Sequence, residues 1–221
     1  MKQQVLKLGG LDCIVIAPPQ AQADVVMLHG RNMRAADLAP FAHSLGLPAR
    51  FIFPDAPLPA APSGRSWWPI DAEARAQAAQ GRPSDLYQFD PPGRAEARAL
   101  LHGLLLEVRS ARPLMLAGFS QGGMLAMDHV LHETRPDALA LLSSSCIAYD
   151  DWKGRLSRLA GLPMLIAHGR DDEELAFAAG ERLRDAALLG GAELTWLPFA
   201  GEHGIPLPVW RALRKQIAAL L

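Results

Sequence analysis

The sequence predicts an α/β fold in which a mainly parallel sheet carries helices on both faces. Short apolar runs alternate with longer segments of helical composition, and this alternation is typical of a parallel sheet built from strand–helix–strand units. Several of these runs are continuously apolar, as expected of strands buried on both faces. With 221 residues, of which 50% are hydrophobic, one domain spanning 1–221 is expected.

The N-terminal part contains four expected strands and one helix. Two strand patterns flank the turn Gly9-Gly10, and the run Val25-Val26-Met27-Leu28 has the composition of a buried strand. The next apolar run stops at Pro54, and the helical segment before it closes at Gly46. The strands are therefore expected at 5–8, 13–16, 25–28 and 51–53, and the helix at 35–45.

An irregular, proline-rich segment follows from 54 to 92 and includes Trp67-Trp68-Pro69. Long loops are uncommon in compact domains and tend to be functional, so this segment is expected to cover or border a site. After it the regular alternation resumes. Strands are expected at 114–117, 138–142, 164–167 and 194–197, and helices at 95–108, 121–132, 173–189 and 208–221. The last helix has several apolar positions, which favour docking onto its own sheet, with a homodimer contact as the alternative.

Composition excludes several classes of partner. The net charge of −1 and the pI of about 6.7 provide no basic face for nucleic acid. No run approaches 18 apolar residues, so no membrane span is expected. The N-terminus lacks the apolar stretch of a signal peptide, and a cytoplasmic location is therefore expected. Cys13 and Cys146 are expected to be small buried apolar residues and not a disulfide.

A candidate nucleophile lies in Gly118-Phe119-Ser120-Gln121-Gly122, which matches G-x-S-x-G. The pentapeptide is a weak signal by itself, and an ordinary glycine-rich turn is the alternative. Here it follows an apolar strand and precedes a helical segment, so it resembles the nucleophile elbow of α/β-hydrolases. The α/β-hydrolase fold is then expected, and the chain length allows only a minimal cap. Ser120 would begin a helix, where the Gln121 N–H can stabilise an oxyanion.

A serine hydroxyl needs a neighbouring base, and in α/β-hydrolases the histidine follows the serine in the chain. His129 and His132 are expected on the surface of the helix after the elbow, and because no further ligands cluster with them, no metal is expected. His168 ends a strand before Gly169 and is expected to fix a turn. His203 lies in a glycine-flanked loop between the last strand and the last helix, where an imidazole can reach over the sheet edge.

The acid that orients this histidine is expected in the loop that starts at His168. Asp171 and Asp172 both lie there, followed by Glu173 and Glu174. Local reasoning leaves the two aspartates open: one can orient His203 while the other caps the next helix. The two glutamates are expected in the first turn of that helix, where negative charge suits its dipole.

These residues resemble the phospholipase/carboxylesterase family, which includes acyl-protein thioesterases. The resemblance spans roughly 25–221, and its most specific piece is the elbow Gly118-Phe119-Ser120-Gln121-Gly122-Gly123. Phe53-Pro54-Asp55-Ala56-Pro57 is similar to the P-x-A-P segment of the family. Arg65-Ser66-Trp67-Trp68 is similar to its R-x-W-aromatic motif.

The resemblance implies a serine hydrolase that cleaves carboxylic ester or thioester bonds of small molecules through an acyl-enzyme, without a cofactor. It implies Asp172 as the acid, because the family places the acid at the fifth position counted from His168. It also implies that the N–H of Arg31, after Leu28-His29-Gly30, is the second oxyanion donor beside Gln121. Trp67 and Trp68 are expected to form an apolar wall for the substrate, with packing of the loop onto the body as the alternative.

Three departures from the family pattern lie near these residues. Asn32, Ser144 and Glu202 each stand where the family usually has glycine, which affects the loop shape, the acyl pocket and the surroundings of His203. No departure removes a catalytic group. Two other functions are compatible with the same residues: a non-catalytic ligand-binding protein on a hydrolase scaffold, and an acyltransferase or perhydrolase that uses the same triad.

Overall fold

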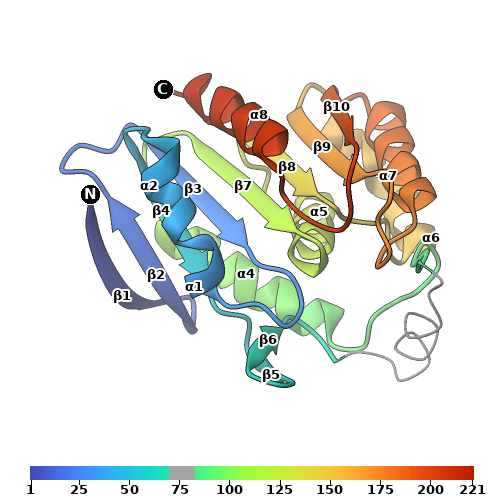
Figure 1. Cartoon of the computed structure of the whole chain (residues 1–221), viewed down its shortest axis with the longest axis horizontal. Coiled ribbons are helices and arrows are strands. Elements are labelled where there is room, and N and C mark those ends of the chain that lie inside the picture. Colours follow the sequence, from blue (N-terminus) through green and yellow to red (C-terminus); the bar gives the residue numbers. More distant parts are fainter. Residues whose placement is uncertain (70–82) are drawn as a thin grey trace.

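The computed structural model describes residues 1–69 and 83–221 (Figure 1). Within them, an eight-stranded sheet has the order β1-β2-β4-β3-β7-β8-β9-β10. The pairs β1–β2 and β2–β4 are antiparallel, and the remaining pairs are parallel. The strands are β1 (Lys2–Leu8), β2 (Leu11–Ala17), β3 (Ala23–Leu28), β4 (Ala49–Pro54), β7 (Leu114–Phe119), β8 (Ala138–Leu142), β9 (Pro163–Gly169) and β10 (Glu193–Phe199).

Helices cover both faces of this sheet (Figure 1). One face is packed by α1 (Ala35–Leu38), α2 (Pro40–Leu45) and α8 (Leu207–Ala218). The other is packed by α4 (Arg94–Val108), α5 (Gln121–His132), α6 (Tyr149–Trp152), the 3-10 helix η1 (Lys153–Leu159) and α7 (Phe177–Leu189). Alternation along β3 explains the two layers, because Val25 and Met27 join the first core while Val26 and Leu28 join the second. The predicted α/β-hydrolase architecture is confirmed.

Each predicted strand lies within an observed one, but three helices differ from the prediction. The last helix ends at Ala218 and not at 221. The helix expected at 35–45 is divided into α1 and α2, because Pro40 has no N–H to continue the first helix. The helix expected at 173–189 begins only at Phe177, since the preceding residues form a turn around Asp172. The short helices α6 and η1 were not predicted.

The irregular segment contains a two-stranded hairpin, β5 (Leu58–Ala60) and β6 (Gly64–Ser66). Its part at 70–82 lies outside the described residues. The helix α8 buries Val209, Trp210, Leu213 and Ile217 against the sheet, which confirms docking onto its own sheet. Cys13 and Cys146 are buried and free, as predicted. Among the described helices, none has the length and apolar character needed to cross a bilayer.

Candidate active site

The predicted site residues follow the carboxyl ends of parallel strands. Arg31 comes after β3, Ser120 directly after β7, Asp172 after β9 and His203 after β10. The carboxyl ends of parallel strands meet at one edge of a sheet, which is where open α/β folds place their sites. The topology therefore gathers four segments that are far apart in sequence.

Ser120 occupies a strained turn between β7 and α5. Its backbone has φ 51° and ψ −119°, a conformation that L-residues rarely adopt and that is found mainly at functional sites. The turn is held by the Ser120 N–H, which donates to the Leu142 carbonyl at 2.9 Å. Gly118 permits the tight return, because a Cβ there would lie 2.3 Å from the Gly122 carbonyl oxygen. The sharp strand-to-helix turn predicted from the motif is therefore present, and the role of Ser120 as a nucleophile stays a prediction.

Asp172, and not Asp171, lies against His203. Oδ2 of Asp172 is 2.8 Å from Nδ1 of His203, and Oδ1 accepts the N–H groups of Glu174 and Leu175 at 2.9 and 2.8 Å. Burial alone would raise the pKa of the Asp172 carboxyl, but the hydrogen bond and charge of His203 lower this pKa below its usual range. One aspartate thus orients the histidine and also holds its own turn.

Asp171 is exposed and accepts the Gly201 N–H at 3.2 Å. The expectation that the second aspartate caps a helix is therefore wrong. The expectation that Glu173 and Glu174 occupy a first helical turn is also wrong, since α7 starts beyond them.

The loop that carries His203 is fixed against neighbouring strands. A Cβ on Gly169 would lie 2.4 Å from the Gly201 carbonyl oxygen, so the ends of β9 and β10 approach closely. The Ser143 hydroxyl donates to the Gly204 carbonyl at 3.0 Å. The His203 ring lies 4.9 Å from the Phe119 ring, next to the elbow. The hydrogen bond between Ser120 and His203 is not among the contacts of the described residues and stays a prediction.

The two expected oxyanion donors lie on either side of the elbow. Within the described residues, the N–H groups of Arg31 and Gln121 have no protein acceptor. Gly30 packs directly on the elbow, since a Cβ there would lie 3.2 Å from Cβ of Ser120. Asn32 has φ 61°, and asparagine tolerates this left-handed conformation better than most residues. The departure at Asn32 therefore retains a turn that suits glycine.

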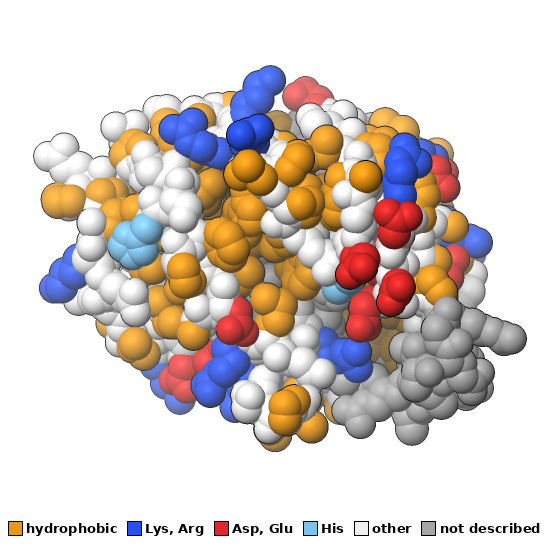
Figure 2. Space-filling model, in the orientation of Figure 1, with side chains coloured by type: hydrophobic (Ala, Val, Ile, Leu, Met, Phe, Trp, Pro, Cys, Tyr) orange, Lys and Arg blue, Asp and Glu red, His pale blue; other side chains and the backbone are white. Residues whose placement is uncertain are grey.

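The other two departures also have defined surroundings. Ser144 is buried and donates its hydroxyl proton to the Ser120 carbonyl at 3.1 Å, so it supports the elbow. Glu202 is exposed. It belongs, with Asp171, Glu173 and Glu174, to a group of exposed acidic residues on the two loops that carry Asp172 and His203. Figure 2 shows a group of acidic side chains on the face of the molecule seen in Figure 1. We call Asp171, Glu173, Glu174 and Glu202 the acidic rim.

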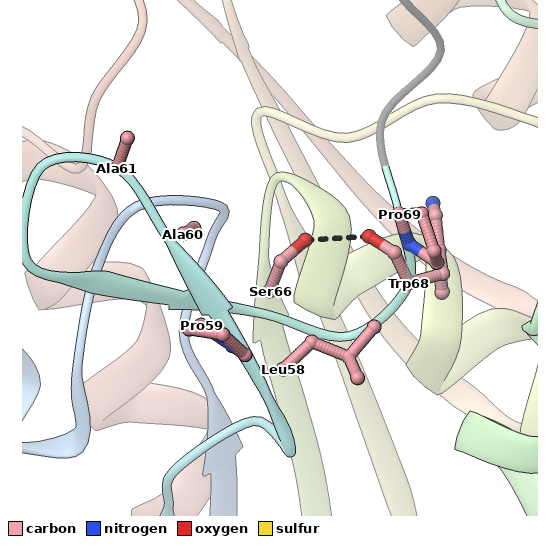
Figure 3. A pocket seen from close by; sticks show the side chains of 7 residues that line it. All are labelled: Leu58, Pro59, Ala60, Ala61, Ser66, Trp68 and Pro69. Carbon is pink, nitrogen blue, oxygen red and sulfur yellow. Dashed lines mark hydrogen bonds between the residues drawn. The ribbon is translucent and has the colours of Figure 1, made fainter.

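The two tryptophans occupy different positions. Trp67 is 1% exposed, and its Nε1–H donates to the His29 carbonyl at 2.9 Å. It therefore packs the proline-rich segment onto the rest of the domain, which was the alternative to a substrate wall. Trp68 is 4% exposed and lines a pocket of about 210 Å³ with Ser66, Pro69 and the β5–β6 hairpin (Figure 3). A role as an apolar wall stays a prediction and fits Trp68 better than Trp67.

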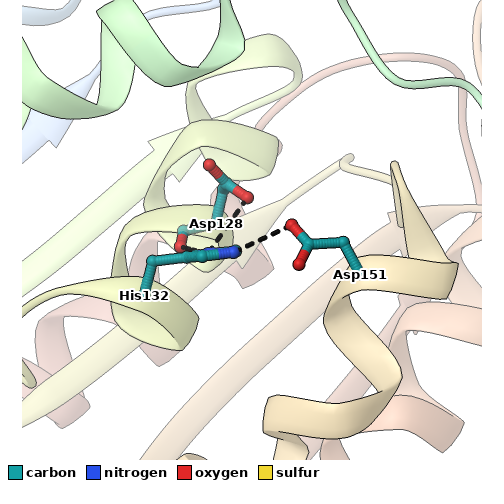
Figure 4. Close-up of side chains that lie close together, drawn as sticks. All are labelled: Asp128, His132 and Asp151. Carbon is teal, nitrogen blue, oxygen red and sulfur yellow. Dashed lines mark hydrogen bonds and ion pairs between the residues drawn. The ribbon is translucent and has the colours of Figure 1, made fainter.

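The expectation that His129 and His132 lie on the helix surface is wrong. His129 is fully buried, and the His132 side chain is only 8% exposed. His132 Nε2 lies 2.9 Å from Asp151, and Asp128 lies beside both residues (Figure 4). The helices α4 and η1 pack along α5, and α6 reaches it through Asp151 and Trp152; sequence periodicity does not reveal this enclosure.

The Asp128, His132 and Asp151 cluster is compensated by arginines. Arg94 contacts Asp128 at 2.6 Å and Asp151 at 3.0 Å, and Arg98 contacts Asp128 at 2.9 Å. A cation would have to displace guanidinium groups to bind there, so the donor set fits an ion-pair network better than a metal site. His168, in contrast, lies as predicted, with Nε2 3.1 Å from the Leu175 carbonyl across the turn.

Sequence reasoning missed the side chains of His29 and Gln121 as structural parts of the site. His29 Nδ1 is 2.6 Å from the Gly30 carbonyl, and Gln121 Oε1 accepts the Trp67 N–H at 2.9 Å. The only sequence feature that points to them is that each lies in a motif of the site, His29 in Leu28-His29-Gly30 and Gln121 directly after Ser120. Side-chain hydrogen bonds across 54 residues leave no local pattern.

Comparisons with known proteins agree with this fold. The family model described as phospholipase/carboxylesterase matches residues 11–190. No curated protein matches the chain. Among solved structures, the chain is similar to esterase PE8 (TM-score 0.78, 21% identity, 100% of both chains covered). It is also similar to Zea mays acyl-protein thioesterase 2 (TM-score 0.76, 19% identity, 94% of this chain and 97% of that one).

A third similar structure is a carboxylesterase from Mesorhizobium loti, with a TM-score of 0.75, 20% identity and 99% of each chain covered. At these identities the structural likeness establishes the fold. The family match covers most of the sequence, including the elbow and the loop that carries Asp172. The chain belongs to the phospholipase/carboxylesterase family of α/β-hydrolases.

Proposed function

We propose that this protein hydrolyses carboxylic ester or thioester bonds of small molecules through an acyl-enzyme on Ser120, with His203 as the base and Asp172 as its orienting acid. The observation that carries the proposal is the 2.8 Å contact of His203 with buried Asp172, beside the strained elbow at Ser120. A strained backbone and a buried acid–imidazole pair both cost folding free energy, and such features are found mainly at functional sites.

In the proposed reaction, Nε2 of His203 takes the hydroxyl proton of Ser120 while Oγ forms a bond to the substrate carbonyl carbon. The tetrahedral intermediate then collapses, the bond to the leaving oxygen or sulfur breaks, and His203 gives its proton to the departing alcohol or thiol. Water repeats the sequence on the acyl-enzyme and releases the carboxylic acid. Asp172 keeps Nδ1 protonated, so that Nε2 is free to act as the base.

The negative charge of the intermediate needs donors that are already in place. The backbone N–H groups of Arg31 and Gln121 are suited to this role, because they lie beside the elbow and have no protein acceptor among the described residues. Gln121 also begins α5, whose N-terminal end favours negative charge. The pocket beside Trp68 is the place proposed for a substrate group, because its lining residue Ser66 is hydrogen-bonded to Gln121 at the elbow.

Hydrolysis of p-nitrophenyl butyrate, followed with Ser120→Ala and with the exposed Ser157→Ala as a matched control, tests the proposal. Loss of the nucleophile of such a unit costs on the order of a million-fold in turnover, whereas Ser157→Ala should behave as the parent protein. A fluorophosphonate probe should label the parent protein and not Ser120→Ala. Near-normal hydrolysis by Ser120→Ala would exclude the mechanism.

A further inference from the structure

The side chain of His29 has a fixed tautomer. The backbone N–H of Ala56 donates to His29 Nε2 at 3.0 Å, so Nε2 must carry a lone pair. A neutral imidazole then has its proton on Nδ1, and Nδ1 lies 2.6 Å from the Gly30 carbonyl oxygen. His29 is fully buried, and this burial lowers the pKa of its imidazole despite nearby Asp55. The neutral Nδ1–H form is the one that satisfies both contacts.

This hydrogen bond fixes the direction of one peptide group. The carbonyl of Gly30 and the N–H of Arg31 belong to the same planar, trans peptide unit, in which they point in opposite directions. Because Nδ1–H of His29 at 2.6 Å and the Met33 N–H at 3.3 Å both hold this carbonyl on one side, the Arg31 N–H is turned to the other. The Asn32 N–H, which donates to the Arg65 carbonyl at 2.9 Å, holds the next peptide. The direction of the Arg31 donor is therefore set from both sides.

Trp67 connects the preceding peptide, between His29 and Gly30, to the elbow. Its Nε1–H donates to the His29 carbonyl at 2.9 Å, and its backbone N–H donates to Gln121 Oε1 at 2.9 Å. The Ser66 hydroxyl lies 3.1 Å from the same oxygen, and Gln121 Nε2 donates to the Trp68 carbonyl at 3.3 Å. All these groups are buried. One continuous hydrogen-bonded path thus runs from the residue before Gly30 to the residue after Ser120.

We propose that the side chains of His29, Trp67 and Gln121 are positioning residues, which hold the Arg31 and Gln121 N–H groups at the spacing that a tetrahedral oxyanion needs. The inference rests on the proposed function. The two donors follow the ends of the paired strands β3 and β7. Strand pairing brings these ends together, and the side-chain contacts then fix the direction of the peptide groups in the loops beyond them. A displacement of about 1 Å at a reacting centre costs roughly a hundredfold in rate, which gives this path a catalytic consequence without any contact to substrate.

Paired substitutions at His29 separate its two contacts. His29→Asn keeps a donor near the Nδ1 position, whereas His29→Gln keeps a polar atom near the Nε2 position and loses the donor to Gly30. His29→Gln should lower kcat for p-nitrophenyl butyrate by about tenfold to a hundredfold with little change in KM. His29→Asn should recover most of kcat. Trp67→Phe removes the indole N–H, keeps the aromatic ring, and should also lower kcat more than it changes KM.

The inhibition constant of a trifluoromethyl ketone distinguishes loss of the oxyanion donors from a general loss of packing. The carbonyl carbon of this inhibitor bonds to Ser Oγ and the former carbonyl oxygen becomes the oxyanion, so its inhibition constant should rise across the variants in proportion to the loss of kcat/KM. His129→Asn, which removes another fully buried histidine outside this path, is the matched control and should leave the inhibition constant unchanged. A kcat for His29→Gln and Trp67→Phe equal to that of the parent protein would overturn the proposal.

Nitrogen NMR of the parent protein tests the same inference without activity or variants. The His29 signal should show a protonated Nδ1 and an unprotonated Nε2 at neutral pH, and a protonated Nε2 would overturn the proposal. Failure of the proposed function has a different signature, since the parent protein would then show no hydrolysis that depends on Ser120.

Discussion

Nδ1 of His203 lies 2.8 Å from Oδ2 of Asp172, whose other oxygen is held by two backbone N–H groups of its own turn. The carboxylate therefore cannot rotate away without breaking that turn. An acceptor fixed in this way selects the imidazole tautomer with its proton on Nδ1, and the proposed mechanism requires that tautomer.

Asp172→Asn should lower kcat for ester hydrolysis by about 10³- to 10⁴-fold, because an amide can favour the wrong tautomer and does not stabilise the imidazolium. Steady-state kinetics on p-nitrophenyl butyrate measure this loss. Asp171→Asn is the matched control, since the Asp171 side chain accepts only the Gly201 N–H among the described residues, and the loss of kcat in this variant should be far smaller. Equal losses in the two variants would argue against Asp172 as the orienting acid.

The strand pattern, the elbow and the family motifs could be predicted from the sequence, because each depends on residues close together in the chain. Continuous apolar runs identified the buried strands, and the strand–Gly–x–Ser–x–Gly–helix order identified Ser120. The choice between Asp171 and Asp172 could not be made from local pattern, since both are acidic and adjacent. It depends on which side chain the β10–α8 loop approaches, and that is a tertiary contact.

The histidines show the same limit. His129 and His132 have the spacing of neighbours on a helix, and the polar character of histidine suggests an exposed face. Here α5 is enclosed by other elements, and Asp128 and Asp151 partner His132 while Thr134 partners His129. The polar lining of that interior comes from segments up to 57 residues apart, so no local rule could predict it.

Burial of His129 should make the fold sensitive to acid. Burial lowers the pKa of His129 from 6.5 to about 3, so between these values the unfolded chain takes up a proton that the folded chain does not. Stability is then complete above about pH 6.5 and decreases as the pH falls, with a slope of up to about 1.4 kcal/mol per pH unit from this group. Urea unfolding between pH 4.5 and 7 measures the slope.

His129→Leu should reduce that slope by up to about 1.4 kcal/mol per pH unit over the same range, which corresponds to the uptake of one proton fewer on unfolding. His43→Gln, at an exposed position of α2, is the control and should follow the parent protein. The same slope in His129→Leu and in the parent protein would assign the acid sensitivity to other groups, of which buried His29 and His168 are the first candidates because burial also lowers the pKa of each.

Asp128 should contribute strongly to stability through its arginine partners. It is fully buried, contacts Arg94 and Arg98, and accepts the Trp152 Nε1–H at 2.8 Å. Asp128→Ala leaves guanidinium groups without their acceptor and should lower the free energy of unfolding by about 3–5 kcal/mol, as measured by urea denaturation. Asp150→Ala removes an aspartate from an exposed pair with Lys153 and should change stability little. A small effect at Asp128 would mean that water replaces the carboxylate.

The acidic rim should select substrates by charge. Asp171, Glu173, Glu174 and Glu202 are exposed on the loops that carry Asp172 and His203, and nearby Arg31 already pairs with Glu174 at 3.4 Å. Negative charge beside a site lowers the association rate of anionic ligands, and salt screens this effect. A neutral thioester of N-acetylcysteamine should therefore have a higher kcat/KM than the acyl-CoA with the same acyl chain, and the difference should narrow as salt is added.

Glu173→Lys should raise kcat/KM for the acyl-CoA by several-fold at low salt and leave the neutral thioester unchanged. Glu173 suits this test because it is exposed and its side chain makes no ion pair among the described residues. Glu96→Lys, an equal charge reversal in the first turn of α4, controls for net charge. If both reversals raise the acyl-CoA rate equally, the overall charge of the protein acts and not the rim; if neither does, the rim has no part in selecting the substrate.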